Sequence, residues 1–492
     1  MRIVIIGAGV VGLSIARVLG MYKGLDIVVV EKEPDVGWGA SKANTSIIHP
    51  GHEEDPELHP LRARLCVEGN KLWRQWVKEL DIPVKWPGEL MVFTNSEEEK
   101  EALRYIDIAR RNNVPGVRAV YGDELRRLEP AISPMAVGAV YAPTAGNISP
   151  FEAVAALAEN LVENGGRILV NTLVKSVRIK GKAVEGVETS RGFIQADIVI
   201  NAAGVHADEI SHSAGVEEDF VIKPRKGEYI VFDEDTSVKP LRLLHTTPTS
   251  LTKGVYAITT TGGDLLIGPT AVDMPYEMKD DTSTTLEGIE YLLREAGKLL
   301  REVPPRSLIT RTFAGVRPEP PQGEWLIKVY EEPWGFINVA GIRSPGLTAA
   351  PAIAYYVADM ISKSYAVSLE RRSDWKPYRR GFPKLHGKSL REIDELVSVN
   401  PDYGEVVCYC RTVSKAEILE AVKRIKTIGA QVTLDGVKFR TKAGFGRCQG
   451  SFCRWRIAGI IAGLEGMEMH EVVVKRERYG LGDVKKILRE EA

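Results

Sequence analysis

The feature that most constrains this fold is a glycine-rich turn near the start of the chain, Gly7-Ala-Gly9-Val-Val-Gly12. The β-branched run over residues 2–6 predicts a buried parallel strand before the turn, and residues up to about Leu19 predict a helix after it. Gly7 permits the tight turn, Gly9 lets the backbone approach a pyrophosphate, and Gly12 allows the helix to pack closely on the strand. Because the helix N-terminus would face the phosphates, the chain is predicted to open with a βαβ unit that binds a dinucleotide.

A carboxylate occupies the place that such a unit requires. Residues 27–31 predict the second strand, and Glu31 at its end follows Gly12 by nineteen residues. A carboxylate there accepts hydrogen bonds from a ribose hydroxyl and would repel a 2′-phosphate, which disfavours NADP. The glycine motif alone could be an incidental turn, and it does not separate FAD from NAD.

Charge and composition exclude several classes of protein. The 65 Lys and Arg residues nearly balance the 66 Asp and Glu residues, which argues against a nucleic-acid-binding protein or a polybasic membrane anchor. No run of about twenty apolar residues occurs, so no membrane span is expected. Arg17 and regularly placed glycines interrupt the apolar start of the chain, which therefore does not predict a signal peptide. We expect a cytoplasmic protein, or one held at the membrane periphery through a partner.

Four of the five cysteines lie near the C-terminus, as Cys408-Tyr-Cys410 and Cys448-Gln-Gly-Ser-Phe-Cys453. Clustered thiols in a large cytosolic chain hold a metal more often than they form disulfides. Four thiolates from two short loops suit a [2Fe-2S] cluster, with structural zinc and an empty thiol cluster as the alternatives. Backbone amides could approach the sulfurs at three glycines, Gly444, Gly446 and Gly450. Cys66, on a segment with helical periodicity, is expected to be a small buried hydrophobic residue.

The segments around these cysteines, Cys410-Arg-Thr-Val-Ser-Lys-Ala-Glu-Ile-Leu and Thr441-Lys-Ala-Gly-Phe-Gly-Arg-Cys448, resemble the bacterioferritin-associated-ferredoxin-like domain found at the end of some flavin dehydrogenases. The resemblance supports a [2Fe-2S] cluster bound by all four cysteines. Within it, Ser414 and Glu417 have the spacing of a capping box, which predicts that a helix starts there.

Most of residues 1–362 resembles the D-amino-acid-oxidase-like family of FAD oxidoreductases, which includes FAD-dependent glycerol-3-phosphate dehydrogenases. Besides the glycine motif, the resemblance is carried by residues 39–51, 200–204, 226–229, 314–318 and 335–348. It implies FAD as the cofactor, with the loop from Ser41 to His49 under the flavin and the turn from Gly341 to Thr348 at its pyrimidine end. The expected FAD-binding residues are Gly7, Gly9, Val10, Val11, Gly12, Glu31, Lys32, Ser41, Asn44, Thr45, Ser46, Val174, Ala203, Gly204, Gly341, Ile342, Gly346, Leu347 and Thr348.

The expected fold class is α/β, with a length of 492 residues divided among several domains. Residues 1–365 form the oxidoreductase region, in which a Rossmann-like FAD-binding domain (about 1–80, 145–215 and 325–365) is interleaved with a mainly antiparallel β substrate domain (about 81–144 and 216–324). Residues 366–404 are expected to be a linker whose many charges are solvated. Residues 405–492 are expected to form a small [2Fe-2S] domain.

The family resemblance implies hydride transfer to flavin from a C–H beside an oxygen or nitrogen, with an arginine holding the substrate anion. Arg317 is in the motif position of that arginine. Arg343 lies within the flavin turn, where a surface ion pair is the alternative interpretation. His49 is the candidate general base. Weaker candidates are two histidines for the base and two lysines for a phosphate, namely His52, His245, Lys226 and Lys253.

Two arginines with lysines suit a dianion, and residues 38–73 resemble glycerol-3-phosphate dehydrogenases of the type that carries the cysteine domain. The reaction that this resemblance implies is oxidation of sn-glycerol 3-phosphate to dihydroxyacetone phosphate, with His49 taking the 2-hydroxyl proton. Electrons would leave singly through the cluster to a partner subunit in a hetero-oligomer. The alternative substrates are a 2-hydroxy acid such as 2-hydroxyglutarate and a secondary amino acid such as proline or sarcosine. An electron-transfer subunit with a vestigial substrate site is disfavoured by the intact glycine motif, and an oxidase is disfavoured by the cluster.

Overall fold

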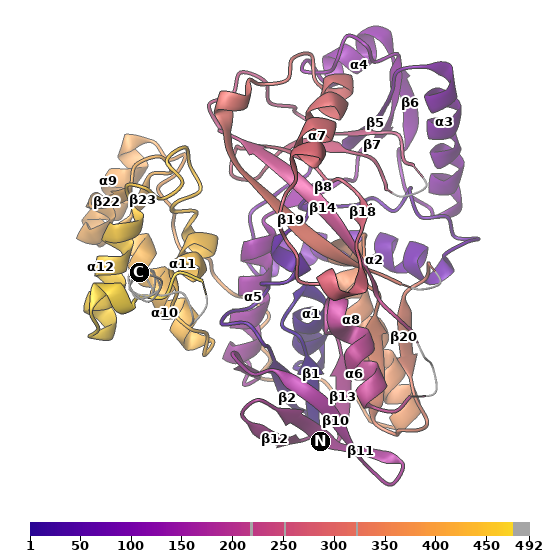
Figure 1. Ribbon diagram of the computed structural model, residues 1–492, viewed down its shortest axis with the longest axis vertical. Coiled ribbons are helices and arrows are strands. Elements are labelled where there is room, and N and C mark those ends of the chain that lie inside the picture. The colour runs from indigo at the N-terminus through magenta and orange to yellow at the C-terminus, as the bar shows by residue number, and fades with distance from the viewer. Residues whose placement is uncertain (217–219, 250–251, 321–322, 476–492) are drawn as a thin grey trace, which may run out of the picture.

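The computed structural model describes residues 1–216, 220–249, 252–320 and 323–475. One domain is built on a mainly parallel sheet, a second on a larger antiparallel sheet, and a small helical C-terminal domain lies against their side (Figure 1). The chain passes between the first two domains several times, so each is assembled from segments that are far apart in the sequence. Among the described helices, none has the length and apolar character needed to cross a membrane.

The first sheet has six strands, with β13 and β1 at its centre and β2 beside β1. All neighbouring strands are parallel except the edge pair β20–β21. In order across the sheet the strands are β20 (Leu326–Val329), β21 (Phe336–Ala340), β13 (Ile198–Asn201), β1 (Arg2–Ile6), β2 (Asp26–Val30) and β9 (Arg167–Leu169). The strand–turn–helix start predicted from the glycine motif is therefore confirmed.

Alternate residues of β1 pack into two hydrophobic cores, as expected of a central parallel strand. Ile3 and Ile5 belong to the core formed with α1 (Val10–Leu19), α2 (Pro60–Glu79), α5 (Pro150–Glu163) and α8 (Gly346–Tyr365). Val4 and Ile6 belong to the core on the other face. That face is covered by α6 (Ala207–Ser213) and by a three-stranded sheet of β10 (Val174–Lys180), β11 (Ala183–Thr189) and β12 (Gly192–Gln195). Cys66 is fully buried within α2, as predicted.

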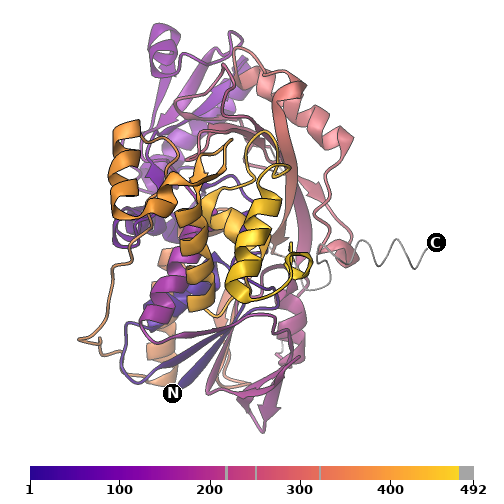
Figure 2. The ribbon, with the colours of Figure 1, turned by 90° about the vertical axis from the view of Figure 1, so that its left-hand side faces the viewer.

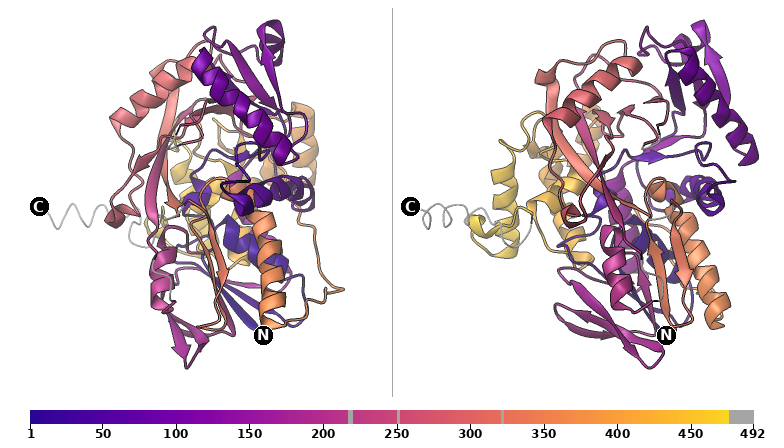
Figure 3. Two further views of the ribbon diagram at one scale, coloured as in Figure 1. Left: turned by 90° about the vertical axis from the view of Figure 1, so that its right-hand side faces the viewer. Right: turned by 45° about the vertical axis from the view of Figure 1, so that its right-hand side comes forward.

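The second sheet contains nine strands, and β5 with β15 is the parallel pair among its described strands. Its order is β18 (Val272–Asp273), β14 (Lys223–Phe232), β17 (Leu265–Gly268), β16 (Tyr256–Thr259), β15 (Leu243–Thr246), β5 (Glu89–Phe93), β7 (Gly138–Ala142) and β6 (Arg118–Tyr121), with β19 (Ile309–Glu319) paired to β14. The long strands β14 and β19 run from the top of this sheet towards the parallel sheet (Figure 3). A small sheet of β3 (Ile47–Ile48), β8 (Gly146–Ile148) and β4 (Val84–Lys85) connects the two domains.

Helices α3 (Ser96–Arg111), α4 (Gly122–Leu128) and α7 (Leu286–Leu299) complete the second domain. Leu292, Ala296 and Leu299 of α7 bury their side chains in the core of the large sheet. The helices and the sheet of this domain thus enclose a common apolar core. The edge of the domain that faces the parallel sheet is not part of this core and can contribute residues to a site.

The C-terminal domain consists of β22 (Val406–Cys408), β23 (Val413–Ser414), α10 (Lys415–Thr427), α11 (Leu434–Thr441) and α12 (Arg454–Glu465). Its helices lie over α5 in Figure 2. Ser414 and Glu417 form the predicted capping box at the start of α10. The predicted domain extends to residue 492, but residues 476–492 lie outside the described part of the chain.

Buried charges fix this domain to both of the others. Arg440 makes a two-point contact with Asp35, with Nη1–Oδ2 and Nη2–Oδ1 distances of 2.5 and 2.9 Å. Arg411, which is 1% exposed, pairs with Asp264 and Glu234 of the antiparallel domain. Planar guanidinium groups suit such paired contacts with carboxylates.

The segment 366–404 is more ordered than the expected linker. It contains the helix α9 (Leu390–Val399), which begins with a capping box at Ser389. Arg379 is only 8% exposed, and its Nε lies 2.7 Å from Glu159 Oε2 of α5. The expectation of a solvated charged face is therefore wrong at Arg379, because this part of the segment docks on the first domain.

Candidate functional site

Close backbone contacts require glycine at two positions of the turn, Gly7 and Gly12. Gly7 has φ +102°, and a Cβ there would lie 2.5 Å from the carbonyl oxygen of Ala202. A Cβ on Gly12 would lie 2.1 Å from the carbonyl oxygen of Gly7. Around Gly9, by contrast, a Cβ would meet only Ser41 Oγ within 4 Å, at 3.1 Å. Gly7 and Gly12 thus hold the strand and helix together, while Gly9 leaves the backbone open to a ligand.

The start of α1 is suited to an anion. Gly9 is the N-cap residue and offers no side-chain cap, and no acidic residue lies in the first turn. The Val10 amide donates to Ser41 Oγ over 2.9 Å. A helix N-terminus without a carboxylate of its own retains its positive end for a phosphate group.

Glu31 stands at the carboxyl end of β2, beside this turn. Its carboxylate accepts the amides of Ala8 and Glu33 at 2.8 and 2.9 Å. Burial raises the pKa of Glu31, and the two amides oppose that effect. The amides hold the carboxylate at the cavity, where it can also accept a bond from a ribose hydroxyl.

The Gly12 contact leads to a first prediction. Gly12→Ala places a methyl group against backbone, and overpacking of this kind costs ~1–3 kcal/mol. We therefore expect about tenfold or greater weakening of FAD binding, measured as the flavin retained after gel filtration. Gly297→Ala in α7 is the control, because a Cβ there has no neighbour within 4 Å. Equal flavin retention by both variants would contradict this role of Gly12.

The glycine turn opens into a cavity of about 520 Å³ between the two domains. It is lined by the expected residues Gly7, Gly9, Val10, Val11, Gly12, Glu31, Lys32, Ser41, Asn44, Thr45, Ser46, Val174, Ala203, Gly204, Ile342, Gly346 and Leu347, and by His49, Arg317 and Arg343. These residues are brought together from strands, loops and helix N-termini of both sheets. The cavity has the size and mixed lining of a site for a cofactor together with a small substrate.

Two expected cofactor residues, Gly341 and Thr348, do not line the cavity. The Thr348 side chain is fully buried, where its hydroxyl accepts the His49 amide at 2.9 Å and donates to the Ile47 carbonyl at 3.3 Å. Gly341 has φ +68°, and a Cβ there would meet Pro320 at 2.7 Å. Both residues shape the turn from within: Thr348 ties the His49 loop to α8, and Gly341 permits the close approach.

His49 lies beside a carboxylate that the sequence analysis missed. Its Nδ1 is 3.0 Å from Glu53 Oε2, and the Glu53 side chain is 2% exposed. Glu53 is held from the other side by Lys253 Nζ at 3.1 Å and by the Tyr256 hydroxyl at 3.2 Å. Lys253 also pairs with Glu54. Because Nδ1 faces the carboxylate, Nε2 is the His49 nitrogen left to act on a ligand in the cavity.

The charged neighbours of Glu53 stabilise its ionised form. Burial alone would raise the pKa of Glu53, but Lys253 and His49 outweigh it and place that pKa well below the usual range. Glu53 is consequently an anion at neutral pH, able to orient the imidazole and to stabilise its protonated form. Sequence reasoning named Lys253 only as a phosphate contact. The signal for Glu53 was its position four residues after His49, which carries little weight outside a helix.

The two arginines differ in how they are neutralised. Arg343 Nε lies 3.1 Å from Glu319 Oε2, so the ion pair considered from sequence is present, but it is partly buried at the cavity wall. Arg317 Nη2 donates to the carbonyl oxygens of Thr270 and Lys226 at 2.5 and 3.5 Å, and its buried Nε has no hydrogen-bond partner. Among the described residues, no carboxylate lies within ion-pair distance of Arg317. Burial lowers the pKa of Arg317, yet a guanidinium remains charged.

Three weaker candidates do not face the cavity. Lys226 Nζ is 3.2 Å from Asp281 Oδ2 and does not line the cavity, so its expected phosphate role is not supported by its position. His52 and His245 are fully buried behind His49, away from any substrate. Burial lowers the pKa of His52 to about 3 and that of His245 to about 4, so both rings are neutral.

The four C-terminal cysteines converge from two loops. Cys408 and Cys453 are buried, whereas Cys410 and Cys448 are partly exposed. The thiols contact each other in the pairs Cys408–Cys453 and Cys410–Cys448. Within the described chain, however, no three of these four sulfurs lie within 4.8 Å of one another. A tetrahedral zinc would bring all four sulfurs to within about 4 Å of one another, so the arrangement favours a two-iron cluster.

Backbone amides point at the sulfurs, as the sulfurs of a cluster require. The hydrogen bond with the Cys453 thiol, helped by the amides of Gly444 and Arg411, outweighs burial and lowers the pKa of Cys408 to about 6. Cys448 receives the amides of Phe452 and Gly450, which lower its pKa against the effect of burial. A Cβ on Gly446 would lie 2.5 Å from Cys410 Cβ. The loop therefore supplies both the donors and the close approach predicted from its glycines.

Aromatic side chains join this loop to the wall of the cavity. Trp38 lines the cavity and meets Phe439 edge-on, with ring centroids 6.0 Å apart. Phe439 stacks on Phe151 at 4.8 Å and lies 6.2 Å from Phe445, three residues before Cys448. The cavity and the cysteine loop thus share one packed wall.

Comparisons with known proteins agree with this geometry. The model of the FAD dependent oxidoreductase family matches residues 2–360, and that of the BFD-like [2Fe-2S] binding domain matches residues 406–463. The chain is 37% identical over 470 residues to a glycerol 3-phosphate dehydrogenase of Caloramator mitchellensis, covering 96% of this chain and 95% of that protein. It is 26% identical over 501 residues to a subunit of the anaerobic glycerol-3-phosphate dehydrogenase of Escherichia coli K12, covering 93% and 87%. A structure of L-α-glycerophosphate oxidase from Mycoplasma pneumoniae with FAD bound superposes with a TM-score of 0.72 at 26% identity, covering 78% of this chain and 99% of that one.

Proposed function

The chain belongs to the FAD-dependent oxidoreductase family and is an FAD-dependent dehydrogenase with a C-terminal [2Fe-2S] domain, and we propose that it oxidises sn-glycerol 3-phosphate to dihydroxyacetone phosphate. The relatives named for glycerol 3-phosphate support this substrate, since one of them spans nearly the whole chain. One observation carries the proposal: the same cavity is lined by a candidate base, His49 with its partner Glu53, and by an arginine without a carboxylate partner, Arg317.

When bound, the flavin supplies a hydride acceptor and the cluster a carrier of single electrons. The residues of this chain would hold the flavin at two helix N-termini. The α1 end, with Gly9 and Val10, would bind the diphosphate, and the α8 end, with Gly346 and Leu347, would bind the ring. No acidic residue lies in the first turn of either helix, so both positive ends are available to an anionic group.

His49 would remove the proton from the 2-hydroxyl of the substrate. A base is required because the C2–H bond yields its hydride readily only as the hydroxyl loses its proton. Glu53 fixes the imidazole through Nδ1 and stabilises the positive charge that the ring gains. Lys253 and Tyr256 are positioning residues, because they hold Glu53 in place and keep it ionised.

Arg317 would bind the phosphate of the substrate. Phosphate is a dianion at neutral pH and accepts the paired donors of a guanidinium. Lys253 and Arg343 already have carboxylate partners in Glu53, Glu54 and Glu319. Of these three cations Arg317 is therefore the one left for an incoming anion, which favours an anionic substrate over a neutral alcohol.

We further propose that the electrons leave through the C-terminal domain to a partner subunit. The relative from Escherichia coli is named as one subunit of its enzyme, which fits such an assembly. Cys410 and Cys448 are the partly exposed ligands, and the neighbouring Tyr409 and Phe452 side chains are 62% and 56% exposed. Exposed aromatic residues beside the outer edge of a cluster suit a protein–protein contact.

Removing a cluster ligand provides a second prediction. Cys448→Ala should lose iron and acid-labile sulfide while retaining FAD, because Cys448 belongs to a loop separate from the flavin-binding segments. Substrate should still reduce the flavin, but reduction of a one-electron acceptor protein should fall. Cys66→Ala, at a buried cysteine of α2, is the control and should keep its iron. Retention of two irons by Cys448→Ala would contradict the ligand assignment.

A substrate panel tests the proposed reaction. The purified holoprotein is assayed anaerobically with an artificial electron acceptor and with glycerol 3-phosphate, 2-hydroxyglutarate, proline or sarcosine in turn. We expect turnover with glycerol 3-phosphate and at most weak turnover with the others. Faster oxidation of 2-hydroxyglutarate or of an amino acid would replace the proposed substrate while leaving the cofactors in place.

A further inference from the structure

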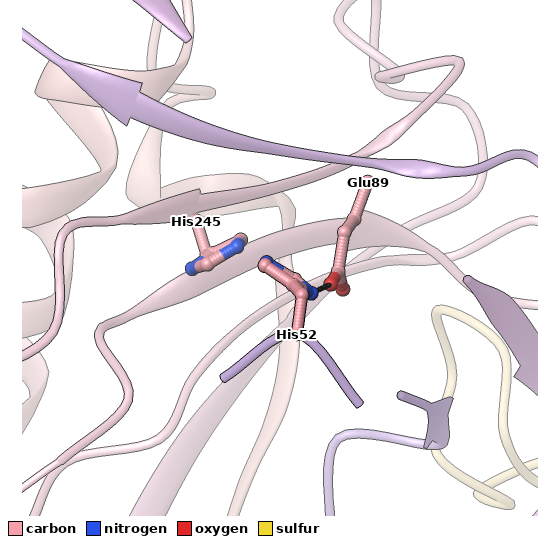
Figure 4. A group of neighbouring side chains, drawn as sticks. All are labelled: His52, Glu89 and His245. Atoms are coloured by element: carbon pink, nitrogen blue, oxygen red, sulfur yellow. Dashed lines mark ion pairs between the residues drawn. The ribbon is translucent and has the colours of Figure 1, made fainter. Parts of the chain in front are cut away.

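We propose that His52, Glu89 and His245 form a binding site for a divalent transition-metal ion, best matched by Zn²⁺, directly behind the His49–Glu53 pair. The three side chains converge within the antiparallel domain (Figure 4). One ligand atom from each lies within 4.8 Å of those of the other two. This site is distinct from the cysteine cluster and from the cavity, and it does not depend on the proposed substrate.

The fold places these residues by sheet register. Glu89 begins β5, and His245 lies on the parallel neighbour β15, where Leu243 is opposite Glu89. His245 is two residues beyond Leu243, so it and Glu89 are diagonal neighbours on one face. His52 comes from the loop that follows β3 and points back to the same place. All three residues are 0% exposed.

The protein satisfies the polar atoms of this group only in part. His52 Nδ1 and Glu89 Oε1 form an ion pair, while among the described residues His52 Nε2, Glu89 Oε2 and His245 Nε2 have no hydrogen-bond or ion-pair partner. Buried polar atoms without a partner destabilise the folded state. A single cation would satisfy several of them together, whereas the surrounding apolar core would not.

The donor chemistry and spacing suit zinc. His245 Nδ1 lies 3.1 Å from the Thr246 carbonyl, a contact that places the proton on Nδ1 and leaves the Nε2 lone pair free. His52 Nδ1 is 3.4 Å from Glu89 Oε1. Two ligands about 2.1 Å from a tetrahedral zinc are separated by about 3.4 Å. Two neutral imidazoles and a carboxylate also form a common set of three protein ligands for this ion.

The site lies beside further acidic donors. Glu89 and Glu53 belong to a second group of converging donors with His49. A dication held by His52, Glu89 and His245 would offset the repulsion between the two carboxylates.

The site would brace the catalytic loop. His52 directly precedes Glu53 and Glu54, so a metal that joins His52 to β5 and β15 fixes the loop carrying Glu53 to the large sheet. The three ligands are therefore positioning residues with respect to His49, and none of them touches the substrate cavity. This arrangement explains why polar residues replace core side chains at all three positions.

The experiment is a zinc titration of the purified holoprotein after dialysis against a chelator, with metal content measured by mass spectrometry. The wild type is expected to bind one zinc per chain beyond the cluster iron and to gain thermal stability with zinc. Glu89→Gln and His245→Gln should lose both effects, whereas the surface variant His470→Gln should retain them. Cobalt substitution then distinguishes the ligands, because nitrogen and oxygen donors lack the intense thiolate charge-transfer bands that cysteine binding would give.

The wild-type measurement alone decides the proposal if a variant fails to fold. A wild-type chain that binds no zinc, cobalt or manganese, and no iron beyond the cluster, overturns it. Cobalt bands of the thiolate type, or full zinc binding by Glu89→Gln, would do the same.

Discussion

His49→Gln is expected to lower kcat by about 10²- to 10⁴-fold, the contribution typical of a positioned general base. Glutamine retains a polar side chain of similar reach but cannot accept the proton of the substrate hydroxyl. KM should change little, because the phosphate contact at Arg317 is untouched. The bound flavin should retain its absorption spectrum, since His49 is one of many residues that line the cavity.

A companion variant tests the role of the carboxylate partner. Glu53→Gln keeps the imidazole but removes the carboxylate 3.0 Å from Nδ1. It should lower kcat less than His49→Gln does. A His49→Gln enzyme with wild-type kcat would show that another group is the base.

Arg317→Ala is expected to cost about 2–4 kcal/mol of transition-state binding, or roughly 30- to 1000-fold in kcat/KM. The reason is that Arg317 lines the cavity and the described residues provide no carboxylate partner for it, so its full charge is available to the substrate. Most of the effect should appear in KM. Inorganic phosphate should inhibit the wild type competitively and the variant more weakly.

Two control variants separate this role from a general structural effect. Arg118→Ala removes a guanidinium on strand β6 of the same sheet that pairs with Glu124 and does not line the cavity. It should leave kcat/KM within a few-fold of wild type. Arg317→Lys keeps the charge but loses the planar fork, and should have an intermediate kcat/KM. Normal turnover by Arg317→Ala would exclude this arginine as the substrate anchor.

The features that could be predicted from the sequence are those formed by residues close together in the chain. The turn around Gly7 and Gly12 could be predicted because a strand–turn–helix unit leaves no room for a side chain at either position. In the structure both glycines make close contacts with backbone carbonyl groups. The capping box at Ser414 could be predicted because it involves residues three apart. The convergence of the four cysteines could be predicted because two short loops carry them together with the amides that approach their sulfurs.

The substrate end could be predicted only in part, because its geometry depends on contacts between distant segments. Glu53 is kept ionised by its ion pair with Lys253, which is two hundred residues away in the chain. The sequence around Glu53 gives no indication of that pair. Thr348 was expected at the cofactor, but its hydroxyl instead accepts the His49 amide and donates to the Ile47 carbonyl. This contact forms because the first turn of α8 packs against β3. Arg379 was expected in solvent and is buried against α5, because the segment after α8 docks on the first domain.

The most direct test of the account is an anaerobic absorption spectrum of the purified protein before and after addition of glycerol 3-phosphate. The account predicts flavin bands together with iron–sulfur absorption, and bleaching of the flavin bands when the substrate is added. Both chromophores without bleaching by glycerol 3-phosphate, but with bleaching by 2-hydroxyglutarate or proline, would contradict the proposed reaction.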